Sequence, residues 1–478
     1  MGSEGIEVLM VTLALQGHMN PMLKFAKQLV SKGVRITIAT NDYARHRMLD
    51  SKNSSALSVT NGGAAAGSTA INLEFFSDGL SHEFDRGKHA DKFIDAVNTE
   101  GYKNLSSLIT NLTNSGRKFS AIIINPFVPW VADIAAEQGI PCAALWIQAS
   151  SVYSIYYHYF RHMELFPDLK YPNETVELPG LPVLEVRDLP TFILPSSPPH
   201  FRNLVEEFVR NLDKIKWVLG SSFYELEEDI VKSMASLKPI SSIGPLVSPF
   251  LLGKEETVQG NVDMWSVEDS CIQWLDKQRP SSVIYIAFGS IIILKQQQIE
   301  SIAAALKKTK QPFLWVLKKS DHATGGELPL GFIEETKEQG LVVSWCPQER
   351  VLIHPALACF VTHCGWNSTL ETVVAGVPVI AYPEWTDQPT DAKLLADVFK
   401  MGVRMRNGED GTLNTEEVER CIREISDGPG AVAMKEKAME LKAAAKKAIE
   451  PEGSSDKNIN RFINEMIGKS FSNSTIVV

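Results

Sequence analysis

Runs of consecutive apolar residues alternate with amphipathic, helix-length segments in the first half of the chain. The first run covers 8–15. It precedes a pattern that predicts a helix from Asn20-Pro21 to about Gly33, because Asn is a good cap and Pro a good first helical residue. Unbroken apolar runs are typical of parallel strands buried on both faces, so this half predicts a doubly wound sheet. The further strands expected here are 34–40, 71–76, 121–124 and 142–146.

The pattern is interrupted after Gly244-Pro245-Leu246. A polar, glycine-containing stretch at 247–267 follows, and it is the best candidate for a linker between two domains. The second half repeats the order of strand and helix and ends in three amphipathic helices. Because open sheets of this kind bind ligands at the carboxyl ends of their strands, we expect two facing domains with a ligand between them. The elements expected in the second half are strands at 283–288, 313–317 and 341–344 and a helix at 295–310.

The segment from Trp345 to Gln388 contains the most specific chemistry in the chain. It begins with a Trp-Cys-Pro-Gln loop, continues through an apolar run at 359–362 to the turn His-Cys-Gly-Trp-Asn-Ser at 363–368, and ends on Asp387-Gln388. A single strand, glycine turn and helix start is more often an ordinary connection. Here, however, the residue types of a nucleotide-sugar site recur along the whole segment.

The turn at 363–368 has the properties of an anion site. A helix N-terminus leaves backbone N–H groups unpaired and carries about half a positive charge. Gly365 lets the backbone approach a phosphate closely, while Asn367 and Ser368 can add donors. His363 ends the preceding strand and can point into the same space. A diphosphate could therefore be held at this turn without a metal ion.

The whole segment resembles, almost position for position, the signature of the plant family 1 UDP-glycosyltransferases of secondary metabolism. The resemblance implies that Trp345 stacks on uracil, that Cys346 offers backbone groups to its edge, and that Gly365 shapes the phosphate turn. It also implies a terminal Gln that selects glucose as the donor sugar. The remaining implied contacts are Gln348 and Glu371 with the ribose, His363, Asn367 and Ser368 with the phosphates, and Trp366, Asp387 and Gln388 with the sugar.

A second chemical feature, Gln16-Gly17-His18-Met19-Asn20-Pro21, stands at the mouth of the first predicted strand. Histidine titrates near neutrality, and a nearby helix N-terminus disfavours its charged form, so His18 is the candidate general base. A histidine in such a turn is by itself more often a structural donor, and the family pattern GHxNP supplies the reason for the catalytic role. Gly17 is assigned to the donor site, as is Ser290, for which plain turn chemistry is an equal alternative.

The chain departs from the family pattern at Asn125, where most relatives have an Asp that supports the histidine. Asn can accept a hydrogen bond from the ring but cannot stabilise an imidazolium by charge. In a serine-protease triad the Asp-to-Asn change costs ~10⁴ in rate, which bounds the effect. A carboxylic acid acceptor, with a pKa near ~4, is already ionised at pH 7 and needs no strong base.

The sequence Asn-Pro-Phe-x-Pro-Trp at 125–130 also resembles the subgroup that glucosylates hydroxycinnamate and benzoate carboxyls. The expected reaction is therefore an inverting, metal-independent transfer of glucose from UDP-glucose to the carboxyl group of a small plant phenolic. Glucosylation of a phenol oxygen or of an electron-rich aromatic carbon is the alternative, and a non-catalytic UDP-sugar-binding protein is a more distant one. Candidate acceptor contacts are Phe127, Trp146, Gln148 and Phe192, although core packing is the commoner role for such side chains.

The resemblance implies the GT-B fold, in which two Rossmann-like doubly wound domains face a cleft. We expect an acceptor domain at 1–246, the linker at 247–267 and a UDP-sugar domain at 268–455. The last helix, 456–470, is expected to pack back on the first domain.

Composition narrows the class of protein further. The 478 residues fit two domains, and the formal net charge of −10 argues against a nucleic-acid partner. No apolar run approaches the ~20 residues that span a membrane, and Glu4 and Glu7 stand where a secretion signal would be basic. The six cysteines have no C-x-x-C spacing, no Asp-x-Asp occurs, and no Gly-x-Gly-x-x-Gly follows a first strand. We therefore expect a cytoplasmic monomer without metal, nicotinamide cofactor or membrane partner.

Overall fold

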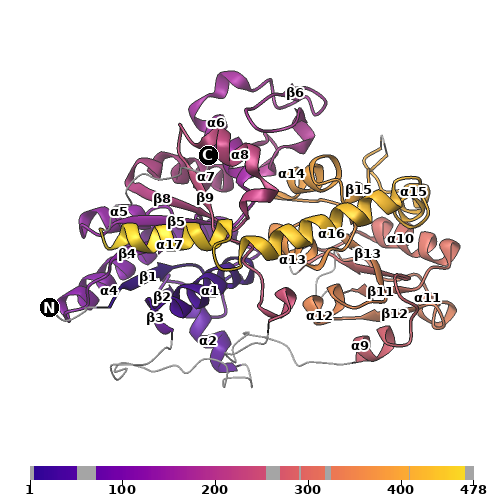
Figure 1. Ribbon diagram of the computed structural model, residues 1–478, viewed down its shortest axis with the longest axis horizontal. Helices are drawn as coiled ribbons and strands as arrows, with labels where there is room; N and C mark the ends of the chain where they lie inside the picture. Colours follow the sequence, from indigo (N-terminus) through magenta and orange to yellow (C-terminus); the bar gives the residue numbers. More distant parts are fainter. Residues whose placement is uncertain are drawn as a thin grey trace.

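The computed structural model describes residues 5–50, 71–254, 270–289, 292–317, 325–408 and 410–468. The described chain forms two parallel sheets, each covered by helices on both faces, which stand side by side (Figure 1). The first sheet has seven strands and the second has six. Both are the doubly wound sheets that the alternating pattern predicts, so the expected fold class is confirmed.

The first sheet is built on strands whose alternate residues enter different cores. In the first strand, Leu9 and Val11 belong to one hydrophobic cluster, whereas Val8 and Met10 belong to another. A strand buried on both faces needs apolar residues at every position, which explains its unbroken run. The strands are, in spatial order, β3 (Asn72–Phe76), β2 (Arg35–Asn41), β1 (Glu7–Val11), β4 (Ala121–Ile124), β5 (Cys142–Trp146), β8 (Ile215–Gly220) and β9 (Ile240–Ser242).

Helices cover both faces of this sheet, and a small antiparallel ribbon stands outside it. The helices are α1 (Gln16–Ser31), α2 (Asp42–Asp50), α3 (Ala90–Ala96), α4 (Tyr102–Asn114), α5 (Val131–Glu137), α6 (Ser150–Arg161), α7 (Pro199–Asn211) and α8 (Glu228–Met234). The ribbon pairs β6 (Thr175–Val176) with β7 (Leu184–Glu185). Two short helical turns, η3 (Val186–Asp188) and η4 (Thr191–Ile193), follow it.

The predicted start of α1 is wrong. The helix begins at Gln16 after Leu15, whose side chain makes no capping bond, and Pro21 lies inside the helix. Asn20 is therefore not its cap. The first strand ends correspondingly earlier, at Val11. As a result, His18 lies in the first turn of a helix and not in a loop before one.

The second sheet repeats the architecture with fewer strands. Its strands are, in spatial order, β12 (Gly340–Val343), β11 (Phe313–Val316), β10 (Val283–Ala287), β13 (Leu357–Thr362), β14 (Val379–Ala381) and β15 (Gly402–Arg404). Its helices are α9 (Ser270–Leu275), α10 (Gln296–Thr309), α11 (Phe332–Glu335), α12 (Gln348–Leu352), α13 (Trp366–Ala375), α14 (Gln388–Lys393), α15 (Thr415–Ser426) and α16 (Ala431–Ala448). Part of the expected linker, 255–267, lies outside the described residues, and the turn η7 (Phe250–Leu252) precedes it.

The end of the described chain returns to the first sheet. Helices α16 and α17 (Ser454–Met466), yellow in Figure 1, pass from the second sheet to the first. The Phe462 ring packs against Phe25 and Trp217, with ring centroids 6.4 and 5.2 Å apart. Lys32 forms an ion pair with Asp456 at 2.6 Å. These contacts attach α17 to the face of the first sheet that α1 covers.

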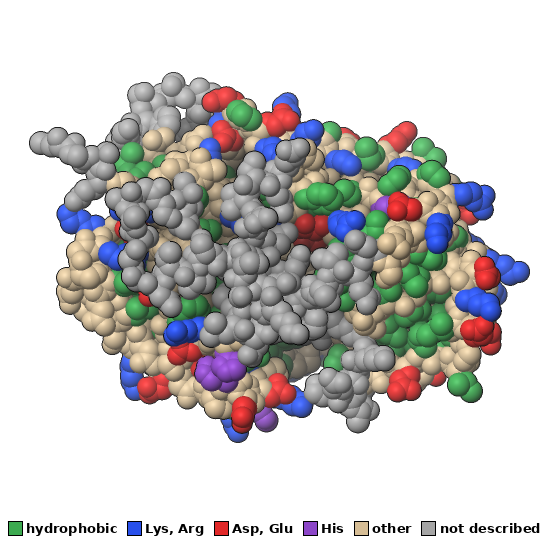
Figure 2. Space-filling view, turned by 90° about the horizontal axis from the view of Figure 1, so that it is seen from below, with side chains coloured by type: hydrophobic (Ala, Val, Ile, Leu, Met, Phe, Trp, Pro, Cys, Tyr) green, Lys and Arg blue, Asp and Glu red, His purple; other side chains and the backbone are tan. Residues whose placement is uncertain are grey.

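All six cysteines are buried and none forms a disulfide. Burial raises the pKa of the thiols of Cys142, Cys346 and Cys359 to about 12, so these groups stay protonated. The described residues contain no helix with the length and apolar character to cross a membrane. On the face in Figure 2, acidic and basic side chains are interspersed outside the grey residues.

Candidate active site

The carboxyl ends of the central strands bring the expected catalytic and donor residues together. The end of β1 leads to Gly17 and His18, and the adjacent β4 leads to Asn125, because Val11 and Ile124 are register partners. On the other side, the ends of β13 and β14 lead to the first turns of α13 and α14. The two sides are in contact, since the Asn367 side chain donates to the Gly17 carbonyl at 3.1 Å.

His18 is a neutral histidine with an unused nitrogen. Its Nδ1 atom is buried and has no hydrogen-bond partner among the described residues. The ring packs on Phe127 with centroids 4.6 Å apart. Burial lowers its pKa to about 4, and no neighbouring carboxylate opposes this change. The imidazole is therefore neutral at pH 7, with a proton on only one nitrogen, and is a weak base.

The side-chain amide of Asn125 forms a local turn with the residues that follow it in sequence. The side-chain oxygen accepts the Phe127 N–H at 3.0 Å, and the backbone N–H donates to the Val11 carbonyl at 2.9 Å. The amide nitrogen is buried without a partner. The structure thus shows no hydrogen bond between Asn125 and His18. Each side chain keeps one buried polar atom without a partner among the described residues, Nδ1 of His18 and the amide nitrogen of Asn125.

Two glycines shape the space around His363. A Cβ added at Gly289 would lie 2.7 Å from its ring, and a Cβ at Gly365 would lie 2.7 Å from Nε2. Gly289 also has a φ of +70°. Both positions therefore require glycine if the ring is to stand between the end of β10 and the start of α13. The ring is neutral, since burial lowers its pKa to about 4, and its Nδ1 atom has no partner among the described residues.

Cys364 closes this turn in a strained backbone conformation. Its φ is +68°, a left-handed value that costs a non-glycine residue roughly 1–2 kcal/mol. The Thr362 side chain compensates by accepting the Cys364 backbone N–H at 3.2 Å. The turn aims the first N–H groups of α13 at the interdomain space. These groups, with Ser368 and His363, form the predicted phosphate site. Ser290 lies outside the described residues.

The nucleoside end of the site contains the expected pair for a ribose. The Gln348 amide donates to Glu371 at 2.8 Å and to the Ser368 hydroxyl at 3.1 Å. Adjacent amide and carboxylate groups can bind vicinal hydroxyls. Tyr285 supports this pair by donating to the Gln348 oxygen at 3.2 Å, and it also contacts Cys346. Trp345 lies half-buried before this pair.

Lys24 is a residue of this site that the sequence did not reveal. It projects from α1 across the interdomain space and forms ion pairs with Glu371 at 3.5 Å and Glu349 at 3.6 Å. Burial raises the pKa of Glu371, and the lysine opposes that change. A lysine on an amphipathic helix gives no distinguishing sequence signal, because most such residues are solvated.

Asp387 and Gln388 lie together at the start of α14, as expected for sugar contacts. Both are buried, and the Gln388 oxygen accepts the backbone N–H groups of Glu384 and Trp385 at 3.0 and 2.9 Å. The amide nitrogen of Gln388 is therefore the group left for a ligand. Asp387 accepts the Thr386 hydroxyl at 2.6 Å, and the Gln148 side chain also bonds to it.

The side chain of Trp366 does not have the free polar group expected of a sugar contact. Its indole N–H donates to the Ser221 hydroxyl at 3.1 Å, and the ring is buried in a hydrophobic cluster shared by the two domains. The indole N–H is therefore occupied, while a contact of Trp366 with the sugar stays a prediction. Trp366 packs the domains together, and only its backbone lies at the N-terminus of α13.

A row of aromatic rings leads from His18 to the sugar end of the site. Phe127, which packs on His18, contacts Phe192 edge-on at 6.5 Å, and Phe192 stacks on Phe201 at 4.8 Å. Trp385 contacts both phenylalanines, at 5.5 and 5.3 Å. Such a wall suits a flat aromatic ligand. Phe201 and Trp385 were not predicted, because single aromatic residues in a sequence usually signal core packing.

Trp146 and Gln148, two other candidate acceptor contacts, occupy different surroundings. The Trp146 ring is buried among Tyr153, Tyr156 and Phe208, and its indole N–H donates to the Ala149 carbonyl at 2.8 Å. It is a core residue, so the acceptor assignment is corrected. Gln148 lies instead beside Asp387, with its side-chain oxygen unpartnered among the described residues.

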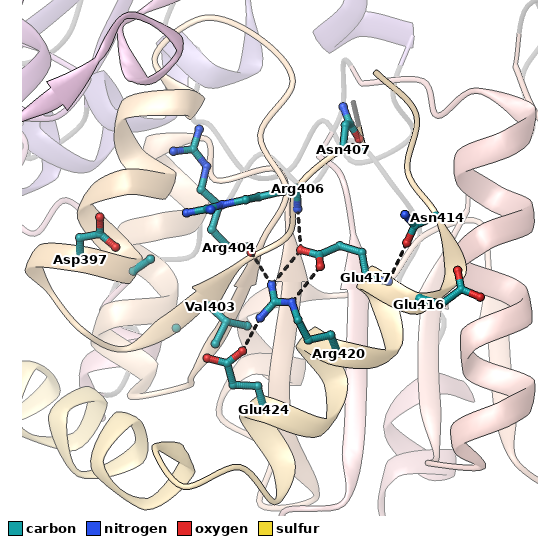
Figure 3. Close-up of a pocket in the computed structure, with 13 residues that line it drawn as sticks. Asp397, Val403, Arg404, Arg406, Asn407, Asn414, Glu416, Glu417, Arg420 and Glu424 are labelled. Atoms are coloured by element: carbon teal, nitrogen blue, oxygen red, sulfur yellow. Dashed lines mark hydrogen bonds and ion pairs between the residues drawn. The ribbon is translucent and has the colours of Figure 1, made fainter. Parts of the chain in front are cut away.

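A hollow of about 720 Å³ lies elsewhere, over β15 and α15 (Figure 3). Two of its three arginines are already engaged, because Arg420 pairs with Glu417 and Glu424, and Arg404 pairs with Asp188. None of the predicted donor or acceptor residues lines it. The candidate site is therefore the interdomain space and not this hollow.

Comparisons with known proteins agree with this geometry. A family model described as UDP-glucoronosyl and UDP-glucosyl transferase matches residues 271–451. The chain is similar to UDP-glycosyltransferase 84B1 of Arabidopsis thaliana, with 51% identity covering 97% of this chain and 99% of that protein. It is also similar to gallate 1-beta-glucosyltransferase of Quercus robur, with 40% identity covering 98% and 92%. Among solved structures, Os79 from O. sativa in complex with UDP has 30% identity, covers 96% of this chain and 100% of that one, and has a TM-score of 0.82.

Proposed function

The chain belongs to the family 1 UDP-glycosyltransferases, and we propose that it transfers glucose from UDP-glucose to the carboxyl group of a small phenolic acid. The product is a glucose ester. The fold is the GT-B arrangement of two doubly wound domains. We further propose 1–246 as the acceptor domain and 268–455 as the UDP-sugar domain, in a monomeric, cytoplasmic protein.

We base the choice of a carboxylate acceptor on the buried, uncharged surroundings of His18. Its pKa is lowered to about 4 by burial, and the residue after β4 is the neutral Asn125. A phenol has an ordinary pKa of about 10, so proton transfer to this imidazole is strongly uphill. A carboxylic acid is ionised before it binds. The site therefore suits an acceptor that brings its own negative charge.

The transfer requires one bond to form as another breaks. A carboxylate oxygen attacks the anomeric carbon of the glucose, and the bond from that carbon to the UDP oxygen breaks on the opposite face, which inverts the configuration. The departing diphosphate keeps the electron pair. The N–H groups at the start of α13, the Ser368 hydroxyl and the His363 imidazole stabilise this charge, so no metal is needed for it.

The neutral state of His18 gives it a second use in this reaction. A neutral imidazole has one N–H donor and one acceptor. Because Nδ1 is buried and unpartnered, Nε2 is the atom available to an acceptor. With the proton on Nε2, His18 donates to the acceptor carboxylate and positions it. With a phenol, the same ring must instead accept a proton.

The relatives support this choice without deciding it. The Quercus robur relative is named a gallate 1-beta-glucosyltransferase, and a Fragaria ananassa relative with 39% identity is named a cinnamate beta-D-glucosyltransferase. Gallate and cinnamate are aromatic carboxylates. The row of aromatic rings from Phe127 to Trp385 suits such molecules.

The test is a screen of matched acceptors with UDP-glucose, read by mass spectrometry and UDP release. Each benzoic or cinnamic acid is paired with the phenol that lacks its carboxyl group. We expect the acids to give products that are cleaved by mild base, as esters are. A base-stable, acid-labile product would identify a phenol glucoside, and a product stable to both would identify a C-glucoside. Tight UDP-glucose binding without turnover of any acceptor would favour a non-catalytic binding protein.

A further inference from the structure

The proposed reaction leaves one buried acid unexplained. Asp391 lies on α14 and is fully buried, and apart from the carboxyl group of Asp387 its carboxyl oxygens have no hydrogen-bond partner among the described residues. Its backbone N–H donates to the Asp387 carbonyl at 3.0 Å, so the two side chains stand one helical turn apart. Side chains with this spacing lie on the same face of a helix. A buried carboxylate without donors or a cation is strongly disfavoured.

The groups that face Asp391 make its charged form less favourable still. Asp387 and Glu227 act on it with negative charge, and burial together with these charges raises the pKa of Asp391 well above its usual range. Both effects favour the protonated, neutral form of its carboxyl group. The titratable groups around the pair are Tyr156 on α6, Glu227 before α8, Cys364 before α13 and Asp387 itself, with Arg404 on β15 acting on Cys364.

We propose that Asp391 is a neutral acid that donates a hydrogen bond to the Asp387 carboxylate and so positions that carboxylate for a hydroxyl of the donor sugar. The role rests on the proposed function of Asp387. The Thr386 hydroxyl, the backbone N–H of Asp387 and the Gln148 side chain also bond to the Asp387 carboxylate. The Asp391 proton is a further donor, and together these donors hold the carboxylate in one orientation.

Tyr156 lies within electrostatic range of the same pair. Its hydroxyl is buried and unpartnered among the described residues, and its pKa is raised by burial and then by the charges of Asp387 and Asp391. A proton on Asp391 removes one of these charges, so the neutral acid is the form that suits this buried surrounding.

Two substitutions separate this positioning role from packing. Asp391→Asn keeps the size and supplies an N–H donor at every pH, whereas Asp391→Leu keeps the bulk and removes the donor. We expect the Asn variant to retain the Kd for UDP-glucose within about twofold at pH 7. The Leu variant should weaken it about tenfold or more, as expected for a lost hydrogen bond to a charged group. The Kd for UDP, which lacks the sugar, should change less than about twofold in both. Calorimetry without an acceptor measures these values.

The pH dependence gives a second readout. In the wild type, UDP-glucose binding should weaken at alkaline pH relative to UDP binding, because Asp391 loses its proton, and Asp391→Asn should lack this change. Equal weakening in the Asn and Leu variants, or the same alkaline profile in the wild type and the Asn variant, would overturn the proposal. Comparing the pH dependence of the wild type with that of Asp391→Asn tests the proposal even if Asp391→Leu does not fold. Because no acceptor is present, absence of glucosyl transfer would sink the proposed reaction without affecting this result.

Discussion

The side-chain amide of Asn367 donates a hydrogen bond to the backbone carbonyl of Gly17 across 350 positions of sequence. This carbonyl is free because of Pro21. In α1 the partner of the Gly17 carbonyl would be the N–H of residue 21, and proline has none. The proline thus gives the phosphate turn of one domain an acceptor beside the histidine of the other. His18 and the donor site are held in register by this bond.

We predict that Pro21→Ala will stabilise the protein but slow the transfer. Ala supplies an N–H that competes for the Gly17 carbonyl, and a helix interior prefers Ala to Pro. Tm should rise, whereas kcat should fall between about twofold and tenfold, the range of one neutral hydrogen bond. Thermal melting and turnover with a preferred acceptor measure the two effects.

The matched control is Asn367→Ala, which removes the donor. It should lower kcat at least as much as Pro21→Ala without raising Tm. Adding Pro21→Ala to it should then cost nothing more in kcat, because the same bond is already lost. Wild-type turnover in Pro21→Ala would contradict this account.

A second prediction concerns Asn125→Asp. A carboxylate at this position raises the pKa of His18, because it stabilises the imidazolium. The ratio of phenol to carboxylate glucosylation should therefore increase about tenfold or more. Its upper limit is ~10⁴, the rate cost of the Asp-to-Asn substitution in a serine-protease triad. Parallel kcat/KM measurements on a benzoic acid and its matched phenol test this, and an unchanged ratio would count against the electrostatic argument. Asn125→Ala is the control for side-chain loss and should not favour phenols.

His18→Ala tests the histidine itself. General acid–base and positioning contributions of ~10² or more predict that turnover falls far below that of the wild type. Retention of more than about a third of wild-type kcat on every acceptor would exclude His18 from the reaction.

Gly365→Ala is predicted to impair donor binding while leaving the fold intact. The backbone at Gly365 has a φ of −59°, which Ala adopts freely, but the new Cβ would lie 2.7 Å from Nε2 of His363. The ring must then move out of the phosphate turn. We expect the Kd for UDP to rise about tenfold or more, as for a lost charge-assisted contact. Gly430 is the N-cap of α16, and a Cβ added there would lie 3.8 Å from the nearest side-chain atom, so Gly430→Ala should bind UDP normally.

The two buried histidines predict a loss of stability in acid. Burial lowers the pKa of His18 and His363 from 6.5 to about 4. Between these values the unfolded chain binds protons that the folded protein does not, so the free energy of unfolding is highest above pH 6.5 and falls as pH drops toward 4. Urea unfolding at pH 7 and pH 5 should show a smaller drop for His363→Gln than for the wild type. An equal drop in both would contradict the prediction, and His82→Gln, at an exposed position, should match the wild type.

Local pattern predicted the central strands well. The apolar runs at 121–124 and 142–146 coincide with β4 and β5, because each is buried on both faces and flanked by polar turns. The start of α1 was missed, since Asn20-Pro21 has the form of a helix start although the helix already runs through it. Capping rules consider only residues that are close in sequence. The Gly17 carbonyl, by contrast, accepts its hydrogen bond from Asn367 of the other domain, which such rules cannot predict.

The sequence predicted many residues of the candidate site, but it did not predict which residues they contact. Lys24 and Asp188 pair with residues of the other domain, and such pairs depend on how the domains meet. The occupied indole of Trp366 has the same cause, because its partner Ser221 follows β8. Asp391 is different. Its spacing from Asp387 is visible in the sequence, but only burial shows that it has no other partner.

The buried thiols have a practical consequence for measuring how the cleft opens. Since every cysteine is inside the protein, a cysteine introduced on the surface is the one that a maleimide dye labels at neutral pH. One label on α7 and one on α12 would place fluorophores on the two domains without prior removal of native cysteines. Energy transfer between them could then follow the opening and closing of the enzyme as UDP-glucose binds.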